Sequence, residues 1–248
     1  MKITMTLLNI ASVISTFVPK YVLKNPKQIK FQNYIKNPNI DIVISTGAAG
    51  TGKTMIATQE GIKMFKAGDY SKIVITRPTV TVEENLGYLP GTLEDKIYPF
   101  LIPIYDYFLE HYTKETLMTM IRNGKLEVAP LAYMRGRTFK NTFIIGDEMQ
   151  NTTPIQLKML LTRIGENSKM VITGDLEQND INTYNGLQNI VDLLEKQYSQ
   201  SNWTYKDDDY KFTSNHEMIK DGFAYINLDD SCIERHKIIQ KVVELYKN

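Results

Sequence analysis

The sequence predicts an α/β fold in which a mostly parallel sheet is flanked by helices. Two observations lead to this prediction. Several runs rich in β-branched residues are apolar almost throughout, which is typical of strands buried on both faces of a parallel sheet. Stretches of helical character lie between several of these runs, and strands that alternate with helices form doubly wound folds. In such folds the ligand sites lie at the carboxyl ends of the strands.

Five strands are predicted, and each run ends in polar residues or glycine. They are DIVIST (41–46), KIVIT (72–76), KLEVAPL (125–131), TFIIGDE (142–148) and KMVITGD (169–175). Helices are predicted after the first and the fourth run, at 53–68 and 152–165. Thr152 or Thr153 is placed to cap the second of these helices. The last residues, 233–248, have the pattern of an amphipathic helix.

The composition is that of an ordinary globular protein. The chain has 248 residues, of which 42% are hydrophobic and 23% are charged. This length suits one large domain, which we place at 27–248 after an N-terminal extension of residues 1–26. The polar stretch 198–222 includes an acidic run at 207–209. We predict an exposed loop or insertion there, because such runs are more often solvated than metal-binding.

Charge and cysteine content restrict the partners and the compartment. The formal net charge is +1, so nucleic-acid binding would have to come from a local patch. Cys232 is the single cysteine, which excludes an internal disulfide and a cysteine-only zinc site, and the three histidines are scattered. This usage favours a reducing, cytoplasmic location.

The first residues form an apolar run, ITMTLLNIASVISTFV (3–18). It is short for a membrane span, and Asn9 with several Ser and Thr residues dilutes it. We expect a packed or frayed N-terminal element and no stable membrane association. A signal peptide is the alternative, because Val13-Ile14-Ser15 would be a permissible cleavage site.

A complete phosphate-loop motif follows the first predicted strand. GAAGTGKT (47–54) matches G-x-x-x-x-G-K-[ST] and opens the next predicted helix. Its glycines allow a loop whose N–H groups face phosphate oxygens, and the helix adds its positive end. Lys53 would reach the β- and γ-phosphates, and Thr54 would ligate Mg²⁺. The residues expected to bind nucleotide in this loop are Gly47, Ala48, Ala49, Gly50, Thr51, Gly52, Lys53 and Thr54.

The fourth predicted strand ends in Asp-Glu, which is the Walker B pattern. Asp147 would hold Mg²⁺ through a water molecule, because Mg²⁺ keeps much of its hydration shell. Glu148 would polarise the attacking water, a role that a hydrolase needs and a phosphoryl-transfer kinase does not. The alternative is an acidic helix start, which the helix dipole favours.

The fifth predicted strand leads into GDLEQ (174–178). If this strand lies beside the Walker B strand, its carboxyl end points at the γ-phosphate. An amide at Gln178 could contact that phosphate or its water and change partners after hydrolysis, whereas a carboxylate would repel the phosphate. We therefore predict catalytic roles for Lys53, Glu148 and Gln178.

Four stretches resemble the motifs of superfamily 1 helicases, and the whole core resembles the PhoH family of ATPases. The four are GAAGTGKT, TRP (76–78), DEMQ (147–150) and GDLEQ. Longer segments carry the PhoH likeness over residues 27 to 195, namely 86–106, 127–165 and 168–180, and it resumes weakly at 223–239. The resemblance implies a P-loop NTPase with a RecA-like core that hydrolyses ATP with Mg²⁺ and acts on single-stranded RNA or DNA.

The resemblance also assigns roles to single residues. Gln32 takes the place of a glutamine that reads adenine, with a surface helix residue as the alternative. Thr76 and Arg77 match a segment that contacts the nucleic-acid backbone, and Gln150 matches a glutamine that links nucleotide to nucleic acid. The sequence departs from the family at Met149, where Ala is frequent, and at Gly146 and Lys237, where aliphatic residues and Pro are frequent.

A lone domain would leave the γ-phosphate open on one side, so we expect an arginine from a neighbouring subunit. The resemblance implies a ring-shaped homo-oligomer, a hexamer, which fits this expectation. Arg163 and Arg235 are candidates for that role. Arg135 and Arg137 could bind nucleic-acid phosphates, reach across an interface, or lie in a solvated turn. The alternative function is an ATP-dependent oligomeric switch without translocation; a kinase fits less well.

Overall fold

A computed structural model describes residues 17–78, 102, 104–178, 184–199 and 214–233. Within them, six strands form one sheet in the order β3-β2-β4-β5-β1-β6, and every pair of neighbours is parallel. The predicted α/β fold with a mostly parallel sheet is therefore confirmed. The strands are β1 (Ile42–Gly47), β2 (Lys72–Arg77), β3 (Leu126–Pro130), β4 (Thr142–Gly146), β5 (Lys169–Gly174) and β6 (Phe223–Leu228).

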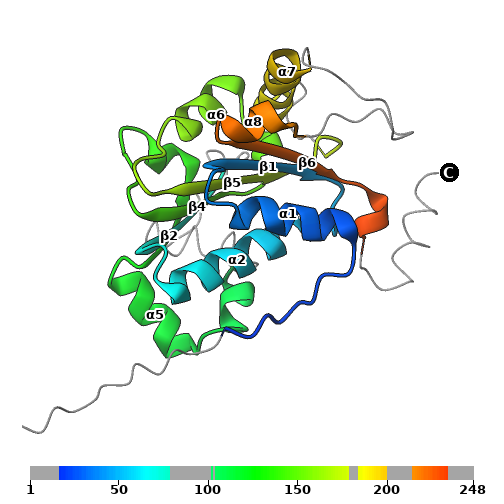
Figure 1. The fold of residues 1–248 in the computed structure, drawn as a ribbon. Helices are drawn as coiled ribbons and strands as arrows, with labels where there is room; N and C mark the ends of the chain where they lie inside the picture. The colour runs from blue at the N-terminus through cyan, green and yellow to red at the C-terminus, as the bar shows by residue number, and fades with distance from the viewer. Residues whose placement is uncertain (1–16, 79–101, 103, 179–183, 200–213, 234–248) are drawn as a thin grey trace, which may run out of the picture.

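Helices cover both faces of the sheet (Figure 1). One face packs against α1 (Pro26–Lys36), α2 (Lys53–Ala67) and α5 (Lys114–Arg122), and the other against α6 (Pro154–Leu161), α7 (Gly186–Tyr198) and α8 (His216–Lys220). Short 3-10 turns follow β3, β4 and β6, namely η1 (Leu131–Met134), η2 (Met149–Asn151) and η3 (Asp230–Cys232).

The two layers explain why the strand sequences are continuously apolar. Along β2, Ile73 and Ile75 are buried in the core under α1, α2 and α5, whereas Val74 between them is buried in the opposite core. Alternate side chains of a strand point to opposite faces, and here each face has helices on it. Both faces of the strand therefore need apolar residues.

The helix predicted at 53–68 is α2, whereas the helix predicted at 152–165 is shorter at both ends. The helix expected at 152–165 runs as α6, and Thr153 caps it while Gln156 bonds back in a capping box. Thr152 is buried and donates instead to the Met149 carbonyl at 2.6 Å. The helix predicted at 233–248 lies outside the described residues, except for Ile233 at its start.

The structure adds a strand that was not predicted, β6, which pairs with the outer side of β1. Its sequence FAYINL is broken by Asn227 and follows the polar stretch 198–222. That stretch is also more structured than an exposed loop, because it includes the end of α7 and all of α8. Residues 200–213 of the stretch lie outside the described residues.

The described part of the N-terminal extension packs along α2. The Phe17 ring stacks on His111 with centroids 5.1 Å apart, and the Tyr21 N–H donates to Gln59 Oε1 at 3.0 Å. Among the residues that the structure describes, no helix is long and apolar enough to cross a membrane.

The strand order decides where the predicted site residues meet. β5 lies between β4 and β1, so the carboxyl ends of the Walker B strand, the GDLEQ strand and the phosphate-loop strand are neighbours. Gly146 pairs with Ile172, and Thr46 pairs with Gly174. The condition set for Gln178, a fifth strand beside the Walker B strand, is therefore met.

Candidate nucleotide site

The GAAGTGKT segment forms a tight loop between β1 and α2. Gly52 is left-handed, with φ 90°, and directly precedes the helix that begins at Lys53. The ammonium group of Lys53 donates to the carbonyls of Gly47 at 2.6 Å and Ala48 at 2.9 Å, so its side chain folds back across the loop. A loop of this kind directs N–H groups and one lysine toward the same small volume, which suits a phosphate.

Gly47 is required by packing as well as by the loop. A Cβ at this position would lie 2.0 Å from the Leu228 carbonyl oxygen at the end of β6. The phosphate loop is therefore pressed against the edge strand that the sequence did not predict.

Asp147 is the centre of the polar contacts at this edge of the sheet. Its side chain is fully buried. The Oδ1 atom accepts hydrogen bonds from the hydroxyls of Thr54 at 2.7 Å and Thr173 at 2.5 Å, and Oδ2 accepts from Arg77 Nε at 2.8 Å. Thr54 and Asp147 are 93 positions apart in sequence, yet the fold joins them as a shared Mg²⁺ site requires. A hydroxyl and a carboxylate are hard oxygen ligands of the type that Mg²⁺ prefers.

Glu148 follows with a strained backbone and an exposed side chain. Its φ is 57°, a conformation that costs a non-glycine residue roughly 1–3 kcal/mol and that is concentrated at functional sites. The carboxylate accepts a hydrogen bond from Gln150 Nε2 at 2.7 Å. Glu148 thus projects from the same strand end as Asp147 but remains open to solvent.

Gln150 connects this carboxylate to the next strand. It is 2% exposed, and its Oε1 accepts the Asp175 N–H at 3.0 Å. A Cβ on Gly174 would lie 2.6 Å from that same Oε1 atom, which explains the glycine. The amide of Gln150 therefore bridges Glu148 and the start of the GDLEQ turn.

Gln178 lies at the far end of that turn and is exposed. Asp175 shapes the turn, because its Oδ1 accepts the Glu177 N–H at 3.0 Å. Within the described residues, the hydrogen bond between the Walker B segment and the start of this turn is made by Gln150. A catalytic role for Gln178 stays a prediction.

The glutamine that touches the phosphate loop is Gln28. Its Nε2 donates to the carbonyls of Thr51 at 3.0 Å and Cys232 at 3.1 Å. Its Oε1 is buried without a hydrogen-bond partner among the described residues. Gln32, the residue expected to read adenine, instead donates to Glu60 Oε1 at 2.6 Å. The two glutamines are one helical turn apart, and the sequence alone did not separate them.

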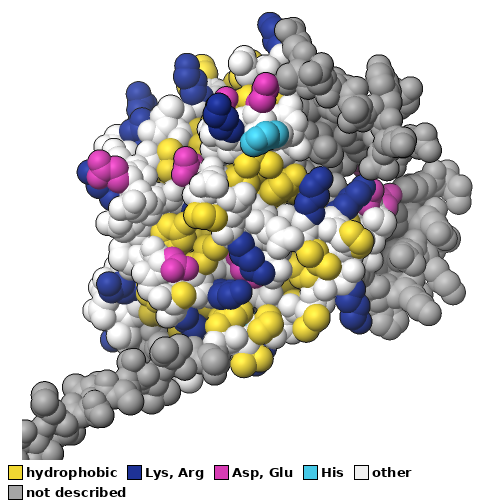
Figure 2. Space-filling view, in the orientation of Figure 1, with side chains coloured by type: hydrophobic (Ala, Val, Ile, Leu, Met, Phe, Trp, Pro, Cys, Tyr) yellow, Lys and Arg dark blue, Asp and Glu magenta, His cyan; other side chains and the backbone are white. Residues whose placement is uncertain are grey.

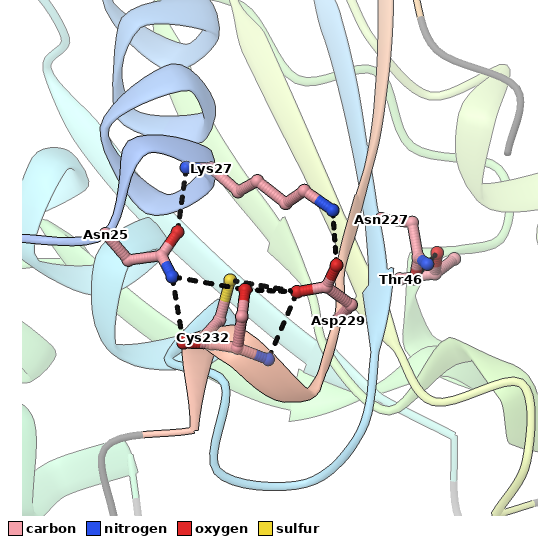
Figure 3. A network of polar contacts seen from close by, with 7 residues as sticks. Asn25, Lys27, Thr46, Asn227, Asp229 and Cys232 are labelled. Carbon is pink, nitrogen blue, oxygen red and sulfur yellow. Dashed lines mark hydrogen bonds and ion pairs between the residues drawn. The ribbon is translucent and has the colours of Figure 1, made fainter. Parts of the chain in front are cut away.

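Polar contacts fix the start of α1 to the segment around η3 (Figure 3). Lys27 forms an ion pair with Asp229, and Asn25 Nδ2 donates to the Ser231 carbonyl at 2.9 Å. The hydrogen bonds from Lys27 and then from Ser231 lower the pKa of Asp229 below its ordinary value. These contacts hold the helix that carries Gln28 against the phosphate loop.

Two of the residues predicted to contact nucleic acid are used inside the site. Thr76 is fully buried, and its carbonyl accepts the Asp147 N–H at 2.9 Å. The guanidinium of Arg77 lies on Asp147, and the Arg77 side chain is 23% exposed. Contact of Thr76 and Arg77 with nucleic acid stays a prediction.

Two further arginines are committed to contacts within the chain. Arg137 binds both oxygens of Glu127, at 2.5 and 2.8 Å, and lies 4.6 Å above the Phe139 ring. Arg163 donates to the carbonyls of Met159 and Arg137. Contact of Arg137 with nucleic acid and donation by Arg163 to another subunit stay predictions. Arg235 lies outside the described residues.

Arg135 is the exception in this group. It is exposed at the corner after β3, two residues from Tyr133, whose side chain is 49% exposed. Leu131 and Met134 of the same turn are buried and anchor it. An aromatic ring and a guanidinium are therefore both exposed in the turn that follows β3. The sequence had pointed to Arg135 but not to Tyr133.

These observations agree with a comparison against protein families. A family model described as PhoH-like protein matches residues 21–219. The chain belongs to the PhoH-like family. The resemblance seen in the sequence motifs is thereby confirmed, and the match includes the phosphate loop, the Walker B segment and the GDLEQ turn.

Curated PhoH-like proteins are similar over most of this chain. A relative from Synechocystis is 40% identical over 89% of the chain, and one from Bacillus subtilis is 39% identical over 83%. Protein PhoH of Escherichia coli is 36% identical over 70%. The chain covers 61%, 58% and 49% of these three relatives, respectively.

Solved structures share the general arrangement at low identity. A Sulfolobus solfataricus SWI2/SNF2 ATPase core in complex with dsDNA is 14% identical, with a TM-score of 0.44, over 87% of this chain and 47% of that one. The Pif1 helicase from Candida albicans is 16% identical, with a TM-score of 0.41, over 92% and 44%. Likeness at this level concerns the fold and says nothing about ligands.

Proposed function

We propose that this PhoH-like chain binds ATP with Mg²⁺ and hydrolyses it, and that it acts on single-stranded RNA or DNA. The observation that carries the hydrolysis is the meeting of Thr54 of the phosphate loop with the buried Asp147, beside an open Glu148. A nucleotide-binding loop, a metal-binding carboxylate and a second carboxylate at one sheet edge are what water attack on a γ-phosphate requires.

Each group has a distinct part in the proposed reaction. Lys53 binds the β- and γ-phosphates, and Thr54 with Asp147 holds the metal ion, which would neutralise charge on the phosphates. Glu148 orients the attacking water. Gln178 contacts the γ-phosphate or that water from the end of the neighbouring β5. Gln150 couples a movement of Glu148 to the GDLEQ turn, because it is hydrogen-bonded to both.

Gln28 is the better candidate for reading the base. It lies on the phosphate loop, and its buried Oε1 lacks a partner among the described residues. Adenine offers an exocyclic amine as a donor, which such an oxygen can accept. A hydrogen bond from the adenine amine would satisfy the buried Gln28 Oε1. This is favourable because a buried polar atom without a partner destabilises the protein.

Strand binding is supported by the Tyr133–Arg135 corner. Bases of any sequence stack on exposed aromatic rings, while arginine contacts the backbone phosphates. Acidic and basic side chains are interspersed on the face drawn in Figure 2, so this face presents no broad basic surface. The corner and the nucleotide site both lie at the carboxyl ends of the parallel strands. This placement allows nucleic-acid binding and nucleotide binding to influence each other.

The second candidate function is a nucleotide-dependent oligomeric switch that does not move along nucleic acid. One observation favours it, an apolar groove of about 420 Å³ between α6 and α7. Ile155 and Leu193 on its walls are 81% and 52% exposed. Exposed apolar surface of this kind is typical of protein interfaces.

ATP turnover measured with a panel of single-stranded RNA and DNA separates the candidates. The first predicts that at least one class of strand raises the turnover. Turnover that is the same with every strand, together with nucleotide-dependent assembly in solution, would favour the oligomeric switch.

A further inference from the structure

Arg77 is placed where it balances the charge of Asp147. The pair joins β2 to the adjacent β4, with Nε at 2.8 Å and Nη2 at 2.5 Å from Oδ2. Oδ1 is occupied separately, by the hydroxyls of Thr54 and Thr173. A fully buried carboxylate needs a compensating cation, since an uncompensated buried charge is strongly destabilising. Arg77 supplies that cation from a side chain that is partly open to solvent.

Mg²⁺ bound at Thr54 and Asp147 would change this balance. A divalent cation beside the carboxylate would supply more charge than Asp147 needs, and it would repel a guanidinium that stayed on the same carboxylate. The resident arginine and the metal ion would then compete for one buried carboxylate.

We propose that Arg77 and Mg²⁺–nucleotide exchange at Asp147, so that metal binding releases the guanidinium to a phosphate of a bound strand. This inference rests on the proposed function and gives its two ligands a physical link. By thermodynamic reciprocity, a nucleic-acid strand that holds Arg77 away from Asp147 increases the affinity for Mg²⁺–nucleotide. The factor is the same as that by which Mg²⁺–nucleotide increases the affinity for the nucleic acid. The arginine lies at the end of β2, at the same sheet edge as the Tyr133–Arg135 corner.

The exchange is tested by binding of a fluorescent ADP analogue with and without Mg²⁺. The ratio of the two Kd values, the metal enhancement, is compared between the wild-type protein and Arg77→Gln. Removing a competitor of the metal raises the enhancement, by roughly tenfold if the coupling is of ordinary size. Arg122→Gln is the control, because Arg122 is an exposed arginine at the end of α5 and belongs to no part of the site. An enhancement in Arg77→Gln that equals or falls below that of the wild type overturns the exchange.

Thermal unfolding provides a second readout for a variant that folds poorly. If Arg77 leaves Asp147 when the metal binds, Arg77→Gln lowers the Tm strongly without metal and little with Mg²⁺–ADP. Equal Tm losses in both conditions would mean that Arg77 stays on Asp147 and is only a structural partner. Failure of the wild-type protein to bind Mg²⁺–ADP at all would contradict the proposed function itself, and the exchange with it.

Discussion

Gln28 and Gln32 lie one turn apart on α1 and make different contacts. Gln28 bonds to the phosphate loop, whereas Gln32 bonds to the buried Glu60. We expect Gln28→Ala to weaken ADP binding about threefold to tenfold, the range of one neutral hydrogen bond, and to reduce the preference for ADP over GDP. Gln32→Ala should keep both the affinity and the preference. Calorimetric titration of both variants with both nucleotides checks this, and loss of preference in Gln32→Ala alone would reverse the assignment.

At the scale of residues, the sequence identified the motif residues but not the contacts that those residues make in the fold. The phosphate-loop and Walker B motifs have fixed spacing, so Lys53, Thr54, Asp147 and Glu148 could be named in advance. The bridging contact of Gln150 with the Asp175 N–H could not, because it depends on the register of β4 against β5. The close approach of Gly174 to Gln150 could not be predicted either, because it depends on the same register.

At the scale of elements, Glu127 joins β3 to its surroundings through Arg137 and Lys72. Hydrogen bonding from Arg137, and then from Lys72, lowers the pKa of Glu127 from its ordinary 4.5 to about 2. A carboxyl with a lowered pKa in the folded state stabilises the fold above its unfolded pKa. This contribution disappears as the pH falls from 4.5 toward 2.

Glu127→Gln should therefore lower the free energy of unfolding at neutral pH, and the difference from the wild type should shrink as the solution is acidified through this range. Denaturant titrations at a series of pH values measure it. Glu166→Gln is the matched control, because the Glu166–Lys140 pair is mostly exposed and such pairs contribute little. A Glu127→Gln penalty that does not change with pH would contradict the role of this carboxylate.

The elements themselves were predictable where burial left a clear pattern. β1, β2, β4 and β5 are largely buried and β3 is partly buried, and all five appear as apolar runs. β6 carries Asn227 and follows a polar stretch, so its strand character was hidden. The contacts of the arginines within the chain could not be predicted, for a different reason. Whether Arg137 or Arg163 faces solvent depends on the position of Glu127 and of the α6 carbonyls, which come from distant parts of the chain.

At the scale of the whole molecule, the nucleotide site and the Tyr133–Arg135 corner occupy one edge of the sheet. We expect Tyr133→Ala to weaken binding of single strands about tenfold, since stacking on an aromatic ring contributes ~1–3 kcal/mol per base. ATP turnover without a strand should stay unchanged, because the nucleotide contacts described above do not include Tyr133. Fluorescence anisotropy with labelled RNA and DNA strands measures the binding.

Met118→Ala is the control for that experiment. Met118 is a large apolar side chain on α5 and is 43% exposed. The helix α5 lies on the face of the sheet that α1 and α2 also cover. The Met118→Ala variant should bind single-stranded RNA and DNA as the wild type does. Equal binding by Tyr133→Ala and the wild type would remove the corner from the proposed strand site.

The central claim is that Glu148 and Asp147 serve hydrolysis at a phosphate loop. Single-turnover measurement with ATP tests it most directly, comparing the wild type with Glu148→Gln and Lys53→Ala. We predict that Glu148→Gln binds ATP as tightly as the wild type but hydrolyses it at least about 100-fold more slowly, as expected when the group that orients the water is lost. Lys53→Ala should lose nucleotide binding or turnover. Hydrolysis at the wild-type rate in both variants would contradict the claim.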